Sequence, residues 1–216
     1  MRKLSAWDGV AVLTILAAFI ATWTVYDRLP EPLPTHFGLD GRPNGWMPRV
    51  YGAWAIPAIA FALWLFMRFI GVVLPKKDEQ RLSMSAMPLV AVMTTVFVCA
   101  VHVVVLYVAI VPHVDVTRIV FALMSIFFIG LGLLMPRLRR NPIMGIRTPW
   151  TLTNEENWAR THRVAGYSMV GGGVLGGVTA LIGGTVGSLA ALLCFLAAGI
   201  IPAIWSLLYA RRQDPS

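Results

Sequence analysis

Long apolar runs recur along the whole chain, and they limit its fold more than any other feature. A helix needs about 20 residues to cross the hydrocarbon of a bilayer. Hydrophobic residues make up 57% of the sequence and charged residues 13%, which is typical of a membrane protein. A strand-built barrel would need short alternating segments, and the sequence lacks them. The six predicted spans are 9–26, 51–73, 87–110, 118–135, 164–185 and 189–209.

We therefore predict an all-α, polytopic membrane protein with six transmembrane helices. Lys and Arg concentrate in the cytoplasmic segments of membrane proteins, so their placement predicts the orientation. With the N-terminus in the cytoplasm, the inside segments hold most of the positive charge, including six arginines from residue 137 to residue 163. The outside segments hold only Arg28, Arg42 and Arg49, with Arg118 at the edge of the fourth span. Both termini are therefore expected in the cytoplasm.

The formal net charge of +8 follows from this asymmetry and indicates attraction to anionic lipids rather than direct nucleic-acid binding. The first apolar run is long for a secretory signal and no small-residue cleavage site follows it, so we expect a retained anchor. In the second span, Arg68 is expected to extend toward the lipid headgroups. The connector 74–86 is expected to be a solvated cytoplasmic loop.

Residues 27–50 are predicted to form a long outer loop. Proline at every second position from Pro30 to Pro34 predicts an extended start close to polyproline II. The sequence Arg-Pro-Asn-Gly at 42–45 predicts a turn, and Trp46 and Tyr51 are expected at the outer membrane interface. A stiff loop loses little entropy on binding, which suits a recognition surface. The alternative is a cap over the mouth of the bundle.

The stretch 141–163 is polar for this chain and contains two Trp, two Glu, three Arg and one His. Thr153-Asn-Glu-Glu156 fits a capping box, which predicts a helix that starts near Thr153 and continues into the fifth span. Glu156 and Arg160 are spaced for an ion pair on that helix. One helix face, expected at the inner headgroup level, carries Trp158, Thr161, His162 and Ala165.

The fifth span is rich in glycine pairs four residues apart, a spacing that lets helix backbones approach closely. The pairs are Gly172 with Gly176, Gly173 with Gly177, and Gly183 with Gly187. We expect them to close the bundle internally, and the alternative is an oligomer formed through this helix. Cys99 and Cys194 fall inside spans and are expected to be packed thiols rather than a disulfide.

Ionisable groups at membrane depth are functional candidates. His102 in the third span has no acidic partner in that span, so we expect a hydrogen bond across helices. The alternative is a small transporter or ion pathway, with His102 and a kink at Pro57 as its signs.

We expect no metal and no cofactor. His36, His113 and Asp115 share the outer side but lack a close ligand spacing. The sequence contains no nucleophile motif, phosphate loop or dinucleotide fingerprint, so no catalytic residue is assigned. A third class, an enzyme acting on a lipid headgroup, would use Glu155, Glu156 and His162.

Two stretches of the sequence resemble a known family. The cytoplasmic stretch is similar to the signature of the SdpI family of bacterial immunity membrane proteins, through Asn141, Gly145, Arg147, Thr148, Pro149, Trp150, Thr151, Leu152, Glu155, Trp158 and Arg163. The outer loop resembles the proline-rich small membrane domain that begins many members, through Leu29-Pro30, Pro34, His36-Phe37, Gly41, Pro43 and Gly45-Trp46. Arg49 stands where a lysine is often found.

The resemblance implies a multi-pass protein of the bacterial inner (cytoplasmic) membrane that has no catalytic activity. It implies a two-span unit, residues 1–86 with the outer loop 27–50, and a four-span unit, residues 87–216 with the cytoplasmic motif loop 137–163. The expected role is resistance to a secreted, membrane-active peptide toxin, together with signalling to a transcriptional repressor held at the membrane.

The same resemblance assigns candidate residues to each partner. The toxin-facing residues would be Leu29, Pro30, Pro34, His36, Phe37 and Trp46. The regulator-facing or structural residues would be Arg147, Thr148, Pro149, Trp150, Glu155, Trp158, His162 and Arg163.

Overall fold

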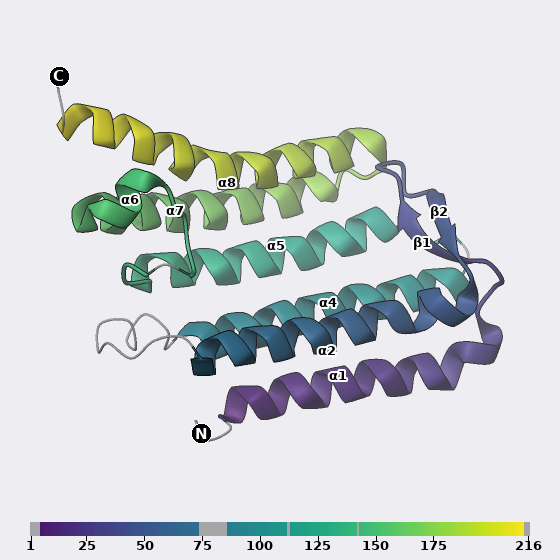
Figure 1. Ribbon diagram of the computed structural model, residues 1–216. Coiled ribbons are helices and arrows are strands. Elements are labelled where there is room, and N and C mark those ends of the chain that lie inside the picture. Colours follow the sequence, from purple (N-terminus) through teal and green to yellow (C-terminus); the bar gives the residue numbers. More distant parts are fainter. Residues whose placement is uncertain (1–4, 74–85, 112, 142, 214–216) are drawn as a thin grey trace.

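The apolar runs form long helices that lie side by side (Figure 1). A computed structural model describes residues 5–73, 86–111, 113–141 and 143–213, so most of the predicted connector 74–86 lies outside the described residues. The long helices are α1 (Ala6–Val25), α2 (Arg49–Val73), α4 (Met87–Ile110), α5 (Val116–Leu134), α7 (Glu155–Ala180) and α8 (Gly184–Gln213). The short elements are η1 (Tyr26–Arg28), β1 (Leu33–Phe37), β2 (Pro43–Met47), η3 (Met135–Arg137) and α6 (Pro149–Thr153).

Five of the described helices are long and apolar enough to cross a membrane, namely α1, α2, α4, α5 and α8. The fifth expected span, 164–185, belongs to α7, which has 26 residues and is not one of these five. Its first turns carry Glu155, Glu156, Arg160 and Arg163, and the rest is rich in glycine, so its apolar content is lower than that of its neighbours.

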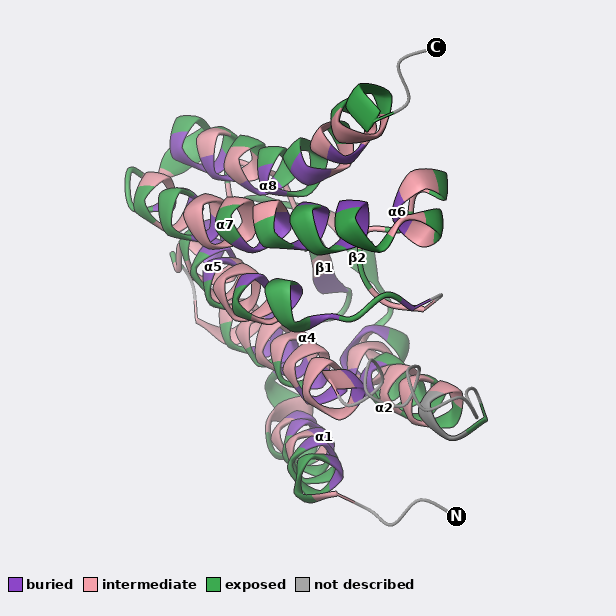
Figure 2. Ribbon diagram, turned by 90° about the vertical axis from the view of Figure 1, so that its left-hand side faces the viewer, coloured by how far each residue is buried: buried purple, intermediate pink, exposed green. Residues whose placement is uncertain are grey.

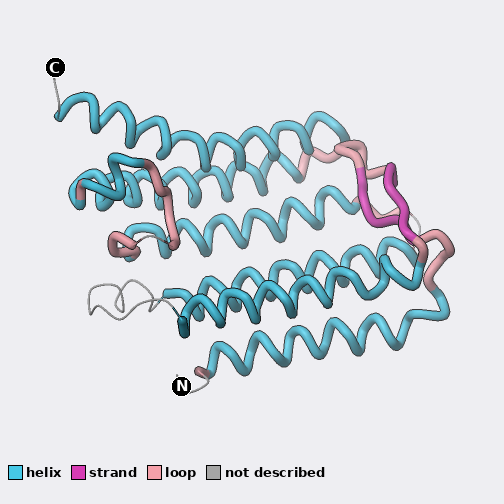
Figure 3. The backbone as a smooth tube through the Cα atoms, in the orientation of Figure 1, coloured by secondary structure: helices cyan, strands magenta, loops and turns pink. Residues whose placement is uncertain are grey.

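The two ends of the bundle differ (Figures 1 and 3). The start of α1, the end of α8 and α6 lie at one end, which we call the motif end. The strands β1 and β2 lie at the other end, which we call the hairpin end. The 141–163 stretch and the proline-rich loop are therefore separated by the length of the helices.

The antiparallel pair β1–β2 departs from the all-α expectation. The turn predicted over 42–45 is wrong, because residues 43–47 form β2. The chain reverses earlier, where the Gly38 amide donates to the Arg42 carbonyl at 2.9 Å and Gly41 takes a φ of +76°. Pro34 and Pro43 are tolerated because both strands of a two-stranded sheet are edge strands.

The hairpin rests on both halves of the bundle. At its base, Leu29 and Leu33 pack with Ala53 of α2 and Leu106 of α4. At its turn, Leu39 packs against a second cluster made by α5, α7 and α8, whose members are Phe121, Ala180, Ala191 and Phe195. The hairpin therefore connects helices from the beginning and the end of the chain.

Glycines on two faces of α7 let it pack between α5 and α8, so the expected internal packing is confirmed. A Cβ on Gly172 would lie 2.9 Å from the Cys194 carbonyl oxygen of α8. A Cβ on Gly173 would lie 3.0 Å from the Ser125 carbonyl oxygen of α5. Figure 2 shows buried residues on the sides where the long helices face one another. Cys99 and Cys194 are free thiols, as expected.

Two polar pairs join helices inside the bundle. His102 Nε2 lies 2.7 Å from Thr22 Oγ1 and both residues are buried, which confirms the expected hydrogen bond between helices. Arg68 pairs with Asp8 of α1, with 3.3 Å between Nε and Oδ1, and its extension toward the headgroups stays a prediction. Asp8 also accepts from Ser5 at the start of α1, and this carboxylate holds the arginine against the bundle.

Candidate functional site

At the motif end, Trp158 and His162 form the centre of a buried polar cluster. Their rings stack with centroids 4.0 Å apart, and both residues are at most 1% exposed. Trp158 Nε1 donates to the Leu138 carbonyl at 2.7 Å, which fixes the segment that follows η3. The sequence analysis placed these residues on one face of α7, and the structure buries that face inside the protein.

His162 uses both ring nitrogens. Because a carbonyl only accepts and an amide only donates, Nδ1 donates to the Trp158 carbonyl at 2.9 Å and Nε2 accepts from the Ile146 amide at 3.1 Å. The ring is therefore neutral. Burial lowers the pKa of His162, and the hydrogen bond to the Trp158 carbonyl opposes this change.

Gly145 allows the loop to lie against the imidazole. Its φ is +102°, in the region that favours glycine, and a Cβ at this position would overlap His162 Nε2. The glycine of the motif therefore serves the contact between the loop and α7.

Asn141 shapes the start of the loop. Its Oδ1 accepts from the amides of Ile143 and Met144 at 2.9 and 2.7 Å, and its Nδ2 donates to the Arg139 carbonyl at 2.9 Å. The side chain is 3% exposed, so these bonds replace those that water would make.

A helix that starts near Thr153 and continues into the fifth span is confirmed, since α7 begins at Glu155, but Thr153 is not its cap because the short helix α6 ends there. Thr148 caps α6, where its amide donates to Thr151 Oγ1 at 2.9 Å, and Pro149 takes the first helical position. Thr153 ends α6, and Asn154 is extended and caps α7 by accepting from the Asn157 amide at 2.9 Å. Sequence spacing misplaced the cap because Thr153 bonds back to the Pro149 carbonyl within α6.

Ser206 of α8 connects the motif to the last helix. Trp150 Nε1 donates to Ser206 Oγ at 2.7 Å, and Asn157 Nδ2 donates to the Ser206 carbonyl at 3.0 Å. Thr161 Oγ1 donates to Asn157 Oδ1 at 2.9 Å. Sequence reasoning missed Asn157 and Ser206. The signal for Ser206 was a polar residue within an apolar run, and the signal for Asn157 was its spacing of one helical turn from Thr161.

The charged residues of the motif face outward. Arg147, Glu155 and Arg163 are exposed. The expected ion pair between Glu156 and Arg160 is confirmed, at 2.8 Å. Hydrogen bonds from the Tyr209 hydroxyl and from Arg160 lower the pKa of Glu156.

The cluster of Glu155, Glu156 and His162 proposed for an enzyme is not assembled. His162 is buried with both nitrogens occupied, whereas the two glutamates are exposed on the first turn of α7.

At the hairpin end, some of the residues predicted to face the toxin are buried and others are exposed. Leu29 and Pro34 are buried, Phe37 is half-buried, and Pro30, His36 and Trp46 are exposed.

Arg49 ties the start of α2 to the loop. Its amide donates to the Glu31 carboxylate at 3.1 Å, its Nη1 donates to the Leu29 carbonyl at 3.2 Å, and its guanidinium lies 5.1 Å from the centroid of the Tyr26 ring. A lysine has one ammonium group and would not make the last two contacts together.

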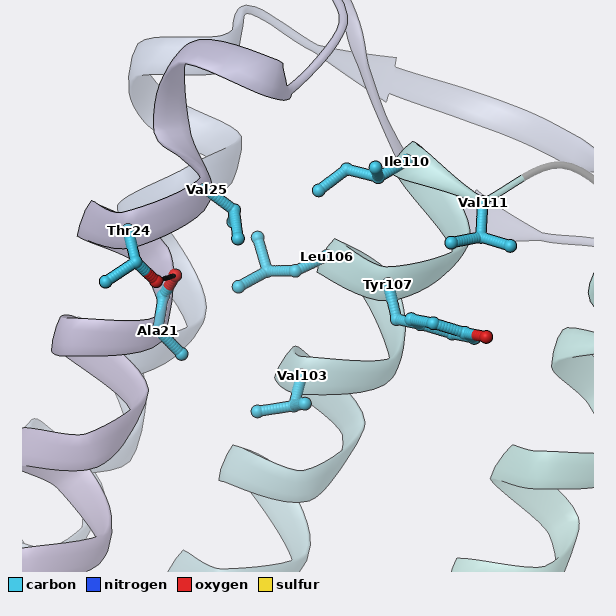
Figure 4. Close-up of a pocket in the computed structure, with 8 residues that line it drawn as sticks. All are labelled: Ala21, Thr24, Val25, Val103, Leu106, Tyr107, Ile110 and Val111. Atoms are coloured by element: carbon cyan, nitrogen blue, oxygen red, sulfur yellow. Dashed lines mark hydrogen bonds between the residues drawn. The ribbon is translucent and has the colours of Figure 1, made fainter.

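An apolar groove lies between α1 and α4 below the hairpin (Figure 4). Its volume is about 210 Å³, and among the residues that line it only Thr24 and Tyr107 carry side-chain oxygens. Thr24 Oγ1 donates to the Ala21 carbonyl at 2.9 Å, so it is already satisfied. The groove suits an apolar group.

Within the described ranges, no group of three His, Cys, Asp or Glu side chains is placed to hold a metal ion. His36 Nδ1 bonds Asn44, and Asp115 caps α5 and pairs with Arg118 at 2.9 Å.

The fold is that of a polytopic helical membrane protein with a buried polar motif at one end and a hairpin at the other. Residues 137–210 match the model of the SdpI/YfhL protein family, and residues 13–61 match a domain of unknown function, DUF1648. Over 207 residues the chain is 21% identical to the immunity protein SdpI of Bacillus subtilis (strain 168), which covers 96% of this chain and 97% of that protein. No solved structure matches the chain.

Proposed function

We propose that this chain is a non-enzymatic immunity protein of the bacterial inner membrane, with SdpI-like character over its whole length. The observation that carries the proposal is the position of the two matched segments. One contains the hairpin and the other contains the motif, and these lie at opposite ends of the same bundle. In this proposal residues 1–86 form a two-span unit and residues 87–216 a four-span unit.

The proposal includes α7 as the sixth span. The predicted span begins at Val164; α7 as a whole has 26 residues, about 39 Å of helix at 1.5 Å per residue, so its first turns extend beyond the hydrocarbon. It lies between α5 and α8, and its glycines make close contacts with both. Six spans place both termini on the motif side, which the positive charge assigns to the cytoplasm.

The hairpin end is the proposed surface for a secreted, membrane-active peptide toxin. Pro30, His36 and Trp46 are exposed there, and Leu29 and Pro34 support them from the buried side. The apolar groove below the hairpin opens to the outside of the bundle and offers a contact for an apolar part of the peptide.

The motif end is the proposed surface for a transcriptional repressor held at the membrane. Arg147, Glu155 and Arg163 are exposed on it. In this proposal the buried Trp158 and His162 hold the loop against α7. The helix α6 is started by Thr148 and Pro149, and it is attached to α8 by Trp150.

The test is protection of membrane potential. Sensitive cells that express the protein are exposed to membrane-depolarising peptides secreted by related bacteria, and the potential is followed with a voltage-sensitive dye. Wild type is expected to retain the potential, Trp46→Ala with His36→Ala to lose it, and Arg147→Gln with Arg163→Gln to retain it. Full depolarisation despite normal expression of wild type would refute the immunity role.

Orientation is tested separately by single-cysteine labelling in a background with Cys99 and Cys194 replaced by Ala. A membrane-impermeant reagent applied to intact cells should label Trp46→Cys and leave Arg147→Cys unmodified. Labelling of both positions from outside would contradict the six-span arrangement.

A further inference from the structure

A second groove lies between α5 and α7 near the motif end. Its volume is about 510 Å³. It exists because Gly132 of α5 and Gly166 of α7 have no side chains, and a Cβ on Gly166 would lie 3.0 Å from the Gly132 carbonyl oxygen. The backbones meet along this line, and Val170 completes an apolar floor beside it.

The groove opens to the outside of the bundle. Leu133 and Tyr167 line it and are 57% and 73% exposed. In a membrane, the material that meets these side chains is lipid. An acyl chain has the shape and the polarity of this floor, and a tyrosine at the rim suits the boundary between hydrocarbon and headgroups.

Positive charge gathers at the motif-end rim of the groove. Arg137 lines it, is exposed, and donates one hydrogen bond to the Leu133 carbonyl. Among the residues that the structure describes, no carboxylate pairs with Arg137 within 4.0 Å. Arg163 is exposed and lies one helical turn before Tyr167, on the same side of α7. A guanidinium presents several donors to a phosphate.

We propose that this groove binds an anionic phospholipid of the cytoplasmic leaflet. The acyl chain lies against Gly132, Gly166 and Val170, and the headgroup phosphate meets Arg137, with Arg163 adding to the local field. The proposal requires the motif end to lie at the membrane surface, and it is independent of immunity, because lipid occupancy is measured on purified protein without a toxin.

The experiment measures lipid occupancy by native mass spectrometry in detergent. Phosphatidylglycerol and phosphatidylcholine with identical dioleoyl chains are titrated onto wild type, Arg137→Gln and Arg42→Gln. Arg42 is an exposed arginine at the hairpin end and serves as the control. Wild type and Arg42→Gln should favour phosphatidylglycerol. Arg137→Gln should lose about fivefold in its affinity, as expected for one arginine near an anionic headgroup.

A second variant tests the apolar part of the site. Val170→Phe fills the groove and should reduce phosphatidylglycerol binding while Arg137 is intact, with circular dichroism as the check on folding. If this variant fails to fold, Arg137→Gln decides alone. Equal occupancy by the two lipids, or unchanged binding by Arg137→Gln, would overturn the proposal. Displacement of the lipid by inorganic phosphate would also overturn it, because the site would then be one for a small anion.

Discussion

The hairpin end and the motif end are held together by different chemistry. At the hairpin end, Leu29 and Leu33 make buried apolar contacts with α2 and α4, and Arg49 adds hydrogen bonds to Glu31 and to the Leu29 carbonyl. At the motif end, Trp158, His162 and Asn157 are buried and hydrogen-bonded to backbone carbonyls and amides of neighbouring segments. Apolar contact tolerates small shifts, whereas buried polar groups require each partner in place. The buried polar groups of the motif end therefore specify one loop conformation, whereas the buried contacts that attach the hairpin are apolar.

The largest expected effect is at the motif end. Trp158→Ala removes a side chain that is 1% exposed and also removes the donor to the Leu138 carbonyl. We expect a loss of about 3–5 kcal/mol in the free energy of unfolding, which thermal and denaturant unfolding in detergent will measure. Trp46→Ala, an exposed tryptophan at the hairpin end, is the matched control and should change it by less than about 0.5 kcal/mol. An equal loss of unfolding free energy in the two variants would contradict the proposed difference between the two ends.

Leu33→Ala tests the hairpin end. The side chain is fully buried between the hairpin, α2 and α4, so its truncation should cost about 2–5 kcal/mol. We expect the damage to be local, with faster cysteine labelling at the hairpin end and unchanged labelling at the motif end. Leu16→Ala, which truncates an exposed leucine of α1, is the control. Increased labelling at both ends would show that the two regions unfold together.

The pH dependence of stability also distinguishes the two ends, because His162, the buried histidine of the motif end, is expected to contribute to it. Burial lowers the pKa of His162 in the folded protein, so the unfolded chain takes up this proton first as the pH falls. The contribution of His162 is therefore fully present above pH of about 6.5 and is lost progressively below it.

Wild type should lose stability through His162 as the pH falls below that value. Unfolding curves at several pH values should show a shallower slope for His162→Gln than for wild type. His36→Gln, at the exposed hairpin surface, should keep the wild-type slope. Identical slopes for His162→Gln and wild type would contradict a lowered pKa of His162 in the folded protein.

The smallest expected effect on stability comes from the exposed arginines of the motif. Arg147→Gln with Arg163→Gln should change the free energy of unfolding by less than about 0.5 kcal/mol, because both side chains are exposed. A pull-down with a membrane-held repressor should nevertheless weaken. A large loss of stability would assign these arginines to the fold instead.

The sequence predicted the long helices because span length and hydropathy are local properties. It missed the hairpin because the proline pattern ends at Pro34, and edge-strand pairing depends on residues about ten positions away. It found the motif residues through resemblance, but not their division into buried and exposed sets. Ser206 and the Asp8–Arg68 pair were out of reach, since each depends on contacts about 50 residues or more away along the chain.

The contact of Leu39 with α5, α7 and α8 has a consequence for the order in which the protein assembles. Chains are made from the N-terminus, so the hairpin is synthesised long before Phe121 and Phe195 exist. Leu39 therefore lacks part of its packing partners until α8 has been made. Its docking is a closing event of biogenesis, and a chain shortened before α8 would leave this leucine without its full receiving cluster.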